Sequence, residues 1–172
     1  MKHCDSDTVS LTFALDVKDG WPPAGAECLP FQRDGGGFRL LVAPLFVRGL
    51  FVGDVIECEI DRVNGMVFEW SHLSKSGHST FWLLRQDDEQ VLLDGLEKLR
   101  ALGCSTVLAP RVGMFSVDVP AAISIDAVDA VFQGLVDHGV AIACPSLRHE
   151  CRGSSPCSRD RADRENPLLR GQ

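Results

Sequence analysis

The order of strand and helix patterns after residue 77 restricts the fold more than any other feature of this 172-residue sequence. Two segments place apolar residues three and four positions apart, which predicts helices, and strand-like segments flank each of them. The resulting order, β-α-β-β-α-β, packs two helices on one face of a four-stranded antiparallel sheet, the ferredoxin-like arrangement. The predicted strands span residues 78–85, 105–109, 114–119 and 140–144.

The two predicted helices have recognisable faces and ends. Leu92, Leu96 and Leu99 share one face of the first helix, and Gly103 stands where a helix is commonly terminated by glycine. Ser124 is the expected N-cap of the second helix, because a serine hydroxyl can accept an unpaired N–H of the first turn. Both helices are therefore expected to bury one apolar face against the sheet.

The first half of the chain is nearly all β in its pattern. Acidic and apolar residues alternate over 56–61, as in a half-buried strand, and Asn64-Gly65 predicts a short hairpin. The predicted fold class is α+β, with an N-terminal β-rich, barrel-like module over 1–77 and a ferredoxin-like βαββαβ module over 78–146.

Residues 147–172 differ from the rest in being polar, rich in arginine and poor in apolar side chains, which predicts a disordered tail. Cysteine and histidine near this tail are ligand types for zinc. Their spacing, Cys-x4-His-x-Cys-x5-Cys, lacks the close pairs of typical zinc sites, so an accidental arrangement is the preferred interpretation. The weak metal candidates are Cys144, His149, Cys151 and Cys157. We expect no metal and no cofactor.

The net charge of the chain also changes sign at residue 147. Residues 1–146 carry 11 Lys and Arg against 20 Asp and Glu, a net charge of −9, whereas residues 147–172 carry a net charge of +2. An acidic body lacks the basic face that nucleic acids require, but it suits a protein partner with a basic surface. The sequence has neither a membrane-length apolar run nor the apolar core of a signal peptide. We therefore predict a cytoplasmic protein that binds no nucleic acid and no membrane, and the oligomeric state stays open.

The sequence Ser76-Gly77-His78-Ser79-Thr80 suggests chemistry more than any other segment. An imidazole beside hydroxyl groups can act as a general base or bind an anion. The alternative, which we prefer, is a hydrogen-bonding role at a loop-to-strand junction. Cys104 and His78 could form a thiolate–imidazole pair, although a buried, inert thiol is the simpler interpretation. His72 is expected at the surface.

Two further features precede residue 56. Gly53-Asp54 predicts a turn in which the carboxylate accepts backbone N–H groups. The apolar residues of 45–52 are either core or an exposed interface patch, with core preferred. The weak catalytic candidates are His78, Cys104 and Asp54. The candidate binding residues are Trp21, Arg48, Asp54, Ser76, His78 and Ser79.

Several ordered motifs resemble a family of short bacterial proteins known as domain of unknown function 4265 (DUF4265). The resemblance covers about residues 10–144 and implies a bacterial, cytoplasmic setting, but it brings no activity. The matching segments are Gly20-Trp21-Pro22-Pro23, Pro44-Leu45-Phe46-Val47-Arg48-Gly49-Leu50, Gly53-Asp54-Val55, Ser76-Gly77-His78-Ser79-Thr80, Gly103-Cys104 and Asp118-Val119-Pro120.

The sequence thus favours a non-enzymatic binding protein, for example an acidic, immunity-like protein that neutralises a basic partner. This preference follows from the acidic body and from the lack of P-loop, nucleophile-elbow and metalloprotease motifs. Two alternatives stay open. One is a small enzyme that uses the segment around His78, and the other is a small-ligand sensor.

Overall fold

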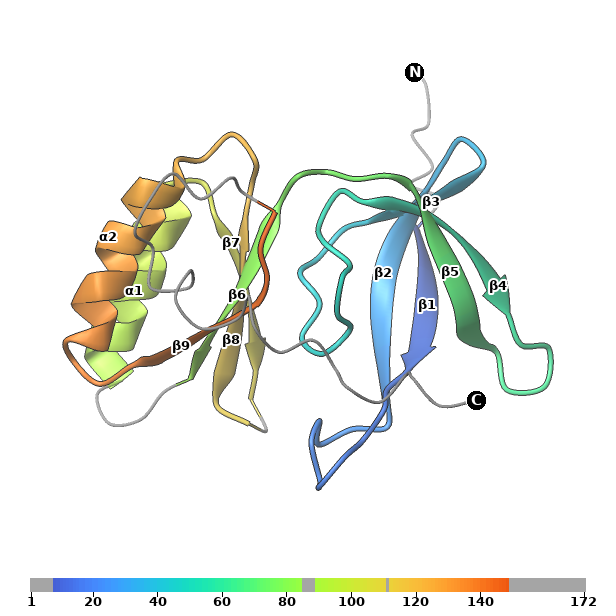
Figure 1. Ribbon diagram of the computed structural model, residues 1–172, viewed down its shortest axis with the longest axis horizontal. Helices are drawn as coiled ribbons and strands as arrows, with labels where there is room; N and C mark the ends of the chain where they lie inside the picture. Colours follow the sequence, from blue (N-terminus) through green and yellow to red (C-terminus); the bar gives the residue numbers. More distant parts are fainter. Residues whose placement is uncertain (1–7, 85–88, 111, 149–172) are drawn as a thin grey trace, which may run out of the picture.

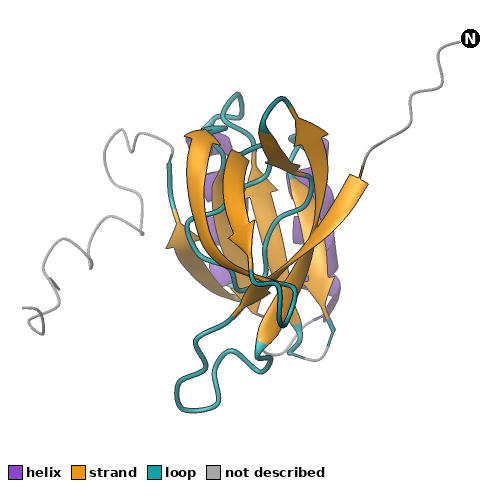
Figure 2. Cartoon of the chain, turned by 90° about the vertical axis from the view of Figure 1, so that its right-hand side faces the viewer, coloured by secondary structure: helices purple, strands orange, loops and turns teal. Residues whose placement is uncertain are grey.

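A computed structural model describes residues 8–84, 89–110 and 112–148. Within these residues the chain forms nine strands and two helices, so the predicted α+β class is confirmed. The strands form two separate sheets, a closed five-stranded barrel and a four-stranded sheet. Figure 1 shows the helices on the side of the four-stranded sheet that faces away from the barrel, and Figure 2 views the molecule from the barrel side.

The barrel is built from the first five strands. Each strand pairs antiparallel with the next, and a short parallel pairing of the first strand with the fifth closes the barrel. The strands are β1 (Thr8–Ala14), β2 (Ala26–Asp34), β3 (Gly37–Leu40), β4 (Val55–Ile60) and β5 (Met66–Ser74).

Alternating apolar side chains fill the barrel interior. Phe31 and Ile56 are completely buried there, and the Phe13 and Phe31 rings lie 6.0 Å apart. Gly37 must be a glycine because a Cβ atom at this position would lie 2.6 Å from the Ile56 carbonyl oxygen. The barrel therefore has its own hydrophobic core.

The second module contains four strands and both helices. The strand order is β7-β8-β6-β9, and all three pairings are antiparallel. The elements are β6 (Ser79–Leu84), α1 (Glu89–Ala101), β7 (Ser105–Ala109), β8 (Met114–Val119), α2 (Ile125–Val136) and β9 (Ala141–Ser146).

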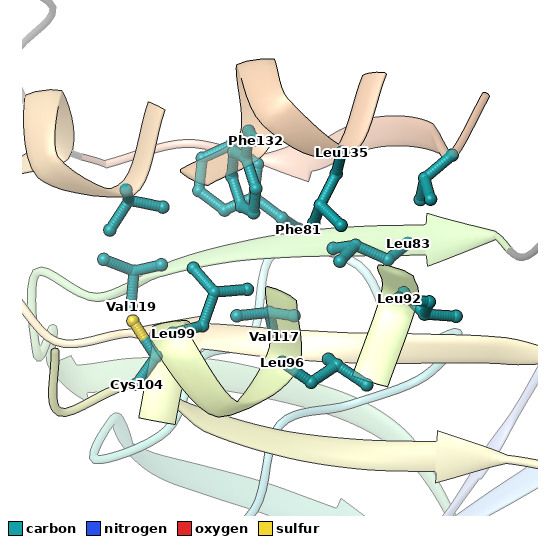
Figure 3. Close-up of a cluster of buried hydrophobic side chains, with 12 residues drawn as sticks. Phe81, Leu83, Leu92, Leu96, Leu99, Cys104, Val117, Val119, Phe132 and Leu135 are labelled. Carbon is teal, nitrogen blue, oxygen red and sulfur yellow. The ribbon is translucent and has the colours of Figure 1, made fainter. Parts of the chain in front are cut away.

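A second hydrophobic core lies between this sheet and the helices, as Figure 3 shows. The predicted face of α1, Leu92, Leu96 and Leu99, is buried in it, and Phe81 of β6 lies 4.9 Å from Phe132 of α2 between ring centroids. Gly103 adopts positive φ after α1, which agrees with its predicted place at the helix end, and Gly139 does the same after α2. The predicted capping role of Ser124 is wrong, because the residue takes the N-cap position but its side chain makes no cap hydrogen bond.

The connection between β3 and β4 lies between the barrel and the second sheet (Figure 1). Ser116 of β8 donates a buried hydrogen bond of 2.9 Å to the Pro44 carbonyl in this connection. Leu50 and Phe51 are buried, whereas the other apolar residues of 45–52 are half-buried, so the preferred core interpretation holds for these two residues only. The apolar segment thus serves to join the two modules.

The predicted start of the tail, at residue 147, lies two residues too early in the sequence. Leu147 packs against the core of the second module, and Arg148 makes several hydrogen bonds that are described below. Residues 149–172 lie outside the described part of the chain, so the prediction of disorder applies to residues that the structure does not describe. None of the described helices is long and apolar enough to cross a bilayer.

Candidate functional site

Asp54 is completely buried at the point where the barrel meets the second module. Its Oδ2 accepts the backbone N–H of Phe51 over 3.1 Å, and its Oδ1 accepts both the N–H and the hydroxyl of Ser76, over 2.8 and 3.0 Å. The prediction that this carboxylate accepts backbone N–H groups is therefore confirmed. The positive φ of Gly53 allows the turn that brings Asp54 inward.

Arg148 reaches Asp54 from the segment that follows β9. One guanidinium nitrogen, Nη1, donates to Asp54 Oδ1 over 2.7 Å, and the other, Nη2, donates to the Gly49 carbonyl over 3.0 Å. The guanidinium carbon also lies 3.8 Å from the centroid of the Phe51 ring, within the range of a cation–π interaction. These contacts fasten the end of the second module to the barrel.

His72 of β5 completes the cluster. Its Nε2 lies 3.0 Å from Asp54 Oδ2 and also 3.0 Å from Arg148 Nη2. A carboxylate only accepts hydrogen bonds and a guanidinium only donates them, so this single nitrogen can satisfy one neighbour at a time. The expectation of a surface position for His72 is wrong, because its side chain is only 19% exposed.

The protonation state of Asp54 follows from its surroundings. Burial alone would raise the pKa of Asp54, but the hydrogen bond from Arg148 and the N–H of Ser76 outweigh it. The pKa of Asp54 is consequently below its ordinary value, and the carboxylate is charged at neutral pH. The site therefore holds a buried ion pair.

A second pair involves His78, whose Nδ1 lies 2.9 Å from the carboxylate of the buried Asp118. The backbone N–H of His78 donates to Ser76 Oγ over 3.3 Å, so the His78–Asp118 pair is connected to the Asp54 cluster. Cys104 does not form the thiolate–imidazole pair that was considered. Burial and then the charge of Asp118 raise the pKa of Cys104 to about 11, which leaves the thiol protonated and unreactive.

A cavity of about 720 Å³ opens beside this cluster, between one end of the barrel and β6. All three tryptophans of the sequence, Trp21, Trp70 and Trp82, line it. Trp21 meets Phe46 edge to face at 5.6 Å, and Trp70 meets His72 in the same way at 5.1 Å. The indole nitrogen of Trp82 is buried and has no hydrogen-bond partner among the described residues. The cavity therefore offers aromatic surface from three tryptophans.

Glu27 of β2 fixes the wall of the cavity that contains Phe46. Its buried carboxylate accepts three successive backbone N–H groups, from Leu45, Phe46 and Val47, over 2.6 to 2.8 Å. Three donors converging on one carboxylate hold the backbone of this segment in place. Arg48 follows directly and also lines the cavity.

The charges around the cavity are not all neutralised. Asp16 pairs with Lys18 over 2.7 Å, and Asp61 accepts the N–H of Val63. No ion pair or hydrogen bond joins Arg48 to another residue that the structure describes, and Arg48 is exposed. The lining thus presents one guanidinium, that of Arg48, and one carboxylate, that of Asp61, that are not engaged in ion pairs with the described residues.

The structure divides the predicted site residues into two groups. Asp54, Ser76, Ser79 and His78 belong to the polar cluster, where Ser79 Oγ accepts the Arg148 N–H over 2.9 Å. Trp21 and Arg48 line the cavity instead. Of the metal candidates only Cys144 is described, it is half-buried, and the described residues contain no group of three metal-ligating side chains. His149, Cys151 and Cys157 lie outside the described residues.

Sequence reasoning missed most of the residues that complete both sites. Glu27, His72 and Trp82 stand in segments read simply as strands, and Asp118 and Arg148 pair with partners far away in the sequence. The one available signal was that the chain has only three tryptophans. Of the three, only Trp21, in the Gly20-Trp21-Pro22-Pro23 motif, is among the predicted binding residues.

Comparisons with known proteins agree with the fold. The family model described as Domain of unknown function (DUF4265) matches residues 29–142. A crystal structure of a hypothetical protein from Neisseria gonorrhoeae is similar, with a TM-score of 0.55 and 17% sequence identity over 87% of this chain and 100% of that chain. At this identity the likeness concerns the fold alone. No curated protein matches the sequence.

Proposed function

The chain belongs to the DUF4265 family, whose description carries no activity, and we propose from the site that it is a non-enzymatic binding protein that holds a small ligand in the tryptophan-lined cavity. The observation that carries this proposal is the convergence of Trp21, Trp70 and Trp82 on one cavity from three distant parts of the sequence. Ligand sites are typically concave, rich in aromatic surface and supplied with a few polar groups.

The polar groups of the cavity indicate the class of ligand. A flat apolar group fits between the indole rings, because aromatic rings pack well against one another. An anionic group on the same ligand would meet the guanidinium of Arg48, which has no ion-pair partner among the described residues. A small aromatic anion is therefore the ligand class that the cavity suits.

A thermal-shift experiment tests this function. 2-Naphthoate, the neutral 2-naphthamide and the cation 2-naphthylmethylammonium share one ring system and differ in charge. We expect 2-naphthoate to raise the melting temperature most, because a ligand that binds only the folded state stabilises it. The Arg48→Gln variant should lose this preference, whereas Arg62→Gln, an exposed control that does not line the cavity, should retain it. The absence of any shift with all three compounds would contradict the proposal.

We also propose an architecture for each of the two modules. The order β7-β8-β6-β9, with α1 and α2 packed on one face, supports a ferredoxin-like second module. The closed pairing of β1 to β5 supports a barrel as the first. In this arrangement the cavity lies where Trp82, on the helix-free face of the sheet, approaches the barrel.

A second candidate function is catalysis by the His78–Asp118 pair. A carboxylate that holds one imidazole nitrogen orients the other as a general base. The hydroxyls of the two serines beside His78 are already engaged, since Ser76 Oγ donates to Asp54 and Ser79 Oγ accepts from Arg148. This engagement makes binding the preferred function. A His78→Ala variant that keeps its fold and ligand binding would remove the support for catalysis.

The binding function can also take the form predicted from the sequence, in which a cytoplasmic protein neutralises a basic partner. It is supported by the net charge of −9 over residues 1–146. Association driven by such charge weakens as salt screens it. A pull-down at low salt that captures no basic protein, or a complex that is indifferent to salt, would count against this form.

A further inference from the structure

We propose that Asp54, Gly49, Phe51 and His72 form a guanidinium-binding site that Arg148 fills in this structure and that accepts a guanidinium group from a second molecule when Arg148 is withdrawn. The site is separate from the tryptophan-lined cavity, so this inference does not rest on the proposed function. It specifies a guanidinium as the chemical group by which the basic partner expected from the acidic residues 1–146 would bind.

The contacts select a guanidinium over an ammonium group. Two different nitrogens of Arg148 are used, one on the Asp54 carboxylate and one on the Gly49 carbonyl. These acceptors lie apart and match the fork of a planar guanidinium, whereas an ammonium is a compact point charge. The Phe51 ring, 3.8 Å from the guanidinium carbon, covers the flat face that an ammonium lacks.

His72 adds an acceptor only when its Nε2 carries no proton. In that state Nε2 can accept from Arg148 Nη2, at the observed 3.0 Å. The charged groups in contact with His72 are Asp54 and Arg148, and the ring of Trp70 packs against its edge. Protonation of Nε2 would turn its hydrogen toward Asp54 and oppose the guanidinium, so the site binds a guanidinium best when Nε2 carries no proton.

The residues that form the site come from both modules. The carboxylate, the carbonyl and the ring come from the β3–β4 connection and the imidazole from β5, whereas Arg148 follows β9 of the second module. Its side chain is 17% exposed, so the site has an opening to solvent. Loss of the Arg148 side chain would leave a buried, charged carboxylate in an otherwise intact receptor.

Chemical rescue of an Arg148→Ala variant tests the proposal. We expect ethylguanidinium to raise the melting temperature of this variant by about 3–6 °C at a concentration about ten times its dissociation constant. Ethylammonium at the same concentration should have no comparable effect. If the variant does not fold alone, ethylguanidinium should restore its circular dichroism spectrum, because ligand binding favours the folded state.

Two controls make the result specific. Arg100→Ala removes an exposed arginine that donates to Thr106 Oγ1, and ethylguanidinium should not stabilise this variant. Rescue of Arg148→Ala should also diminish when His72→Ala removes the Nε2 acceptor. Equal effects of ethylguanidinium and ethylammonium on Arg148→Ala, or equal effects of ethylguanidinium on the two variants, would overturn the proposal.

Discussion

Arg148 and Asp54 lie 94 positions apart in the sequence and form a 2.7 Å ion pair between the two modules. Asp54 is fully buried and the Arg148 side chain is half-buried, which makes the pair unlike an exposed salt bridge. An ion pair of this kind contributes little relative to apolar packing, but removal of one partner leaves the other charge without compensation. The pair therefore makes the relative position of the two modules depend on both residues.

Asp54→Asn should destabilise the protein by about 3–5 kcal/mol, because Arg148 and His72 would face a neutral amide in place of the carboxylate. Urea unfolding followed by circular dichroism measures this change. Glu59→Gln is the matched control, since Glu59 lies exposed on the adjacent strand β4, and it should change the free energy of unfolding by less than about 0.5 kcal/mol. Similar losses for the two variants would contradict a central role for Asp54.

The stabilising effect of Asp54 should depend on pH in a defined direction. The pKa of Asp54 is lower in the folded protein than in the unfolded chain, where it is about 3.9. The carboxylate therefore contributes its full stabilisation above this value and loses it as the pH falls through the folded-state pKa. The difference in unfolding free energy between wild type and Asp54→Asn should be constant from pH 7 to 5 and should shrink below about pH 4. A difference that grows on acidification would contradict the assignment.

Glu27→Gln should loosen the cavity wall around Phe46. A glutamine has one carbonyl oxygen where the carboxylate uses both oxygens to accept three N–H groups, and its NH2 group would face a backbone donor. We expect a loss of about 1–3 kcal/mol in stability and faster amide exchange at Leu45, Phe46 and Val47. Hydrogen-exchange mass spectrometry checks this expectation, and unchanged protection of these amides would refute it.

Two helical glycines should respond in opposite ways to substitution by alanine. A Cβ atom at Gly95 of α1 would lie within 2.5–2.9 Å of the buried Leu135 side chain, so Gly95→Ala should cost about 1–3 kcal/mol. A Cβ atom at Gly134 of α2 would meet open space, and Gly134→Ala should gain up to about 1 kcal/mol from helix propensity. Thermal unfolding of both variants measures the contrast. Stabilisation by both substitutions would show that α1 and α2 are less closely packed than described.

The elements of the fold were largely predictable because their signals are local. The spacing of Leu92, Leu96 and Leu99 identifies the buried face of α1, and Asn64-Gly65 marks the β4–β5 turn. Asp54 was also within reach, because Gly53-Asp54 is a local turn motif. Local patterns thus explain the strands, the helices and one member of the polar cluster.

The rest of the site depends on contacts between modules, which no local pattern encodes. His72 occupies an ordinary strand position and becomes significant only because Asp54 and Arg148 approach it. Trp82 alternates with core residues of β6 and gains its role from the barrel that lies opposite. Glu27 likewise meets its three N–H donors 18 to 20 residues later in the chain. The sequence alone does not show that these residues lie close together in space.

The central claim, that the tryptophan-lined cavity binds a small aromatic anion, is tested most directly by two-dimensional 1H–15N NMR. The protein has three tryptophans, so its spectrum contains three indole N–H signals, all from the cavity. On titration with 2-naphthoate we predict that all three signals shift while the amides of α1 and α2 stay in place. Arg48→Gln should weaken the binding about tenfold, equivalent to about 1.4 kcal/mol. Indole signals that do not move at millimolar 2-naphthoate would contradict the claim.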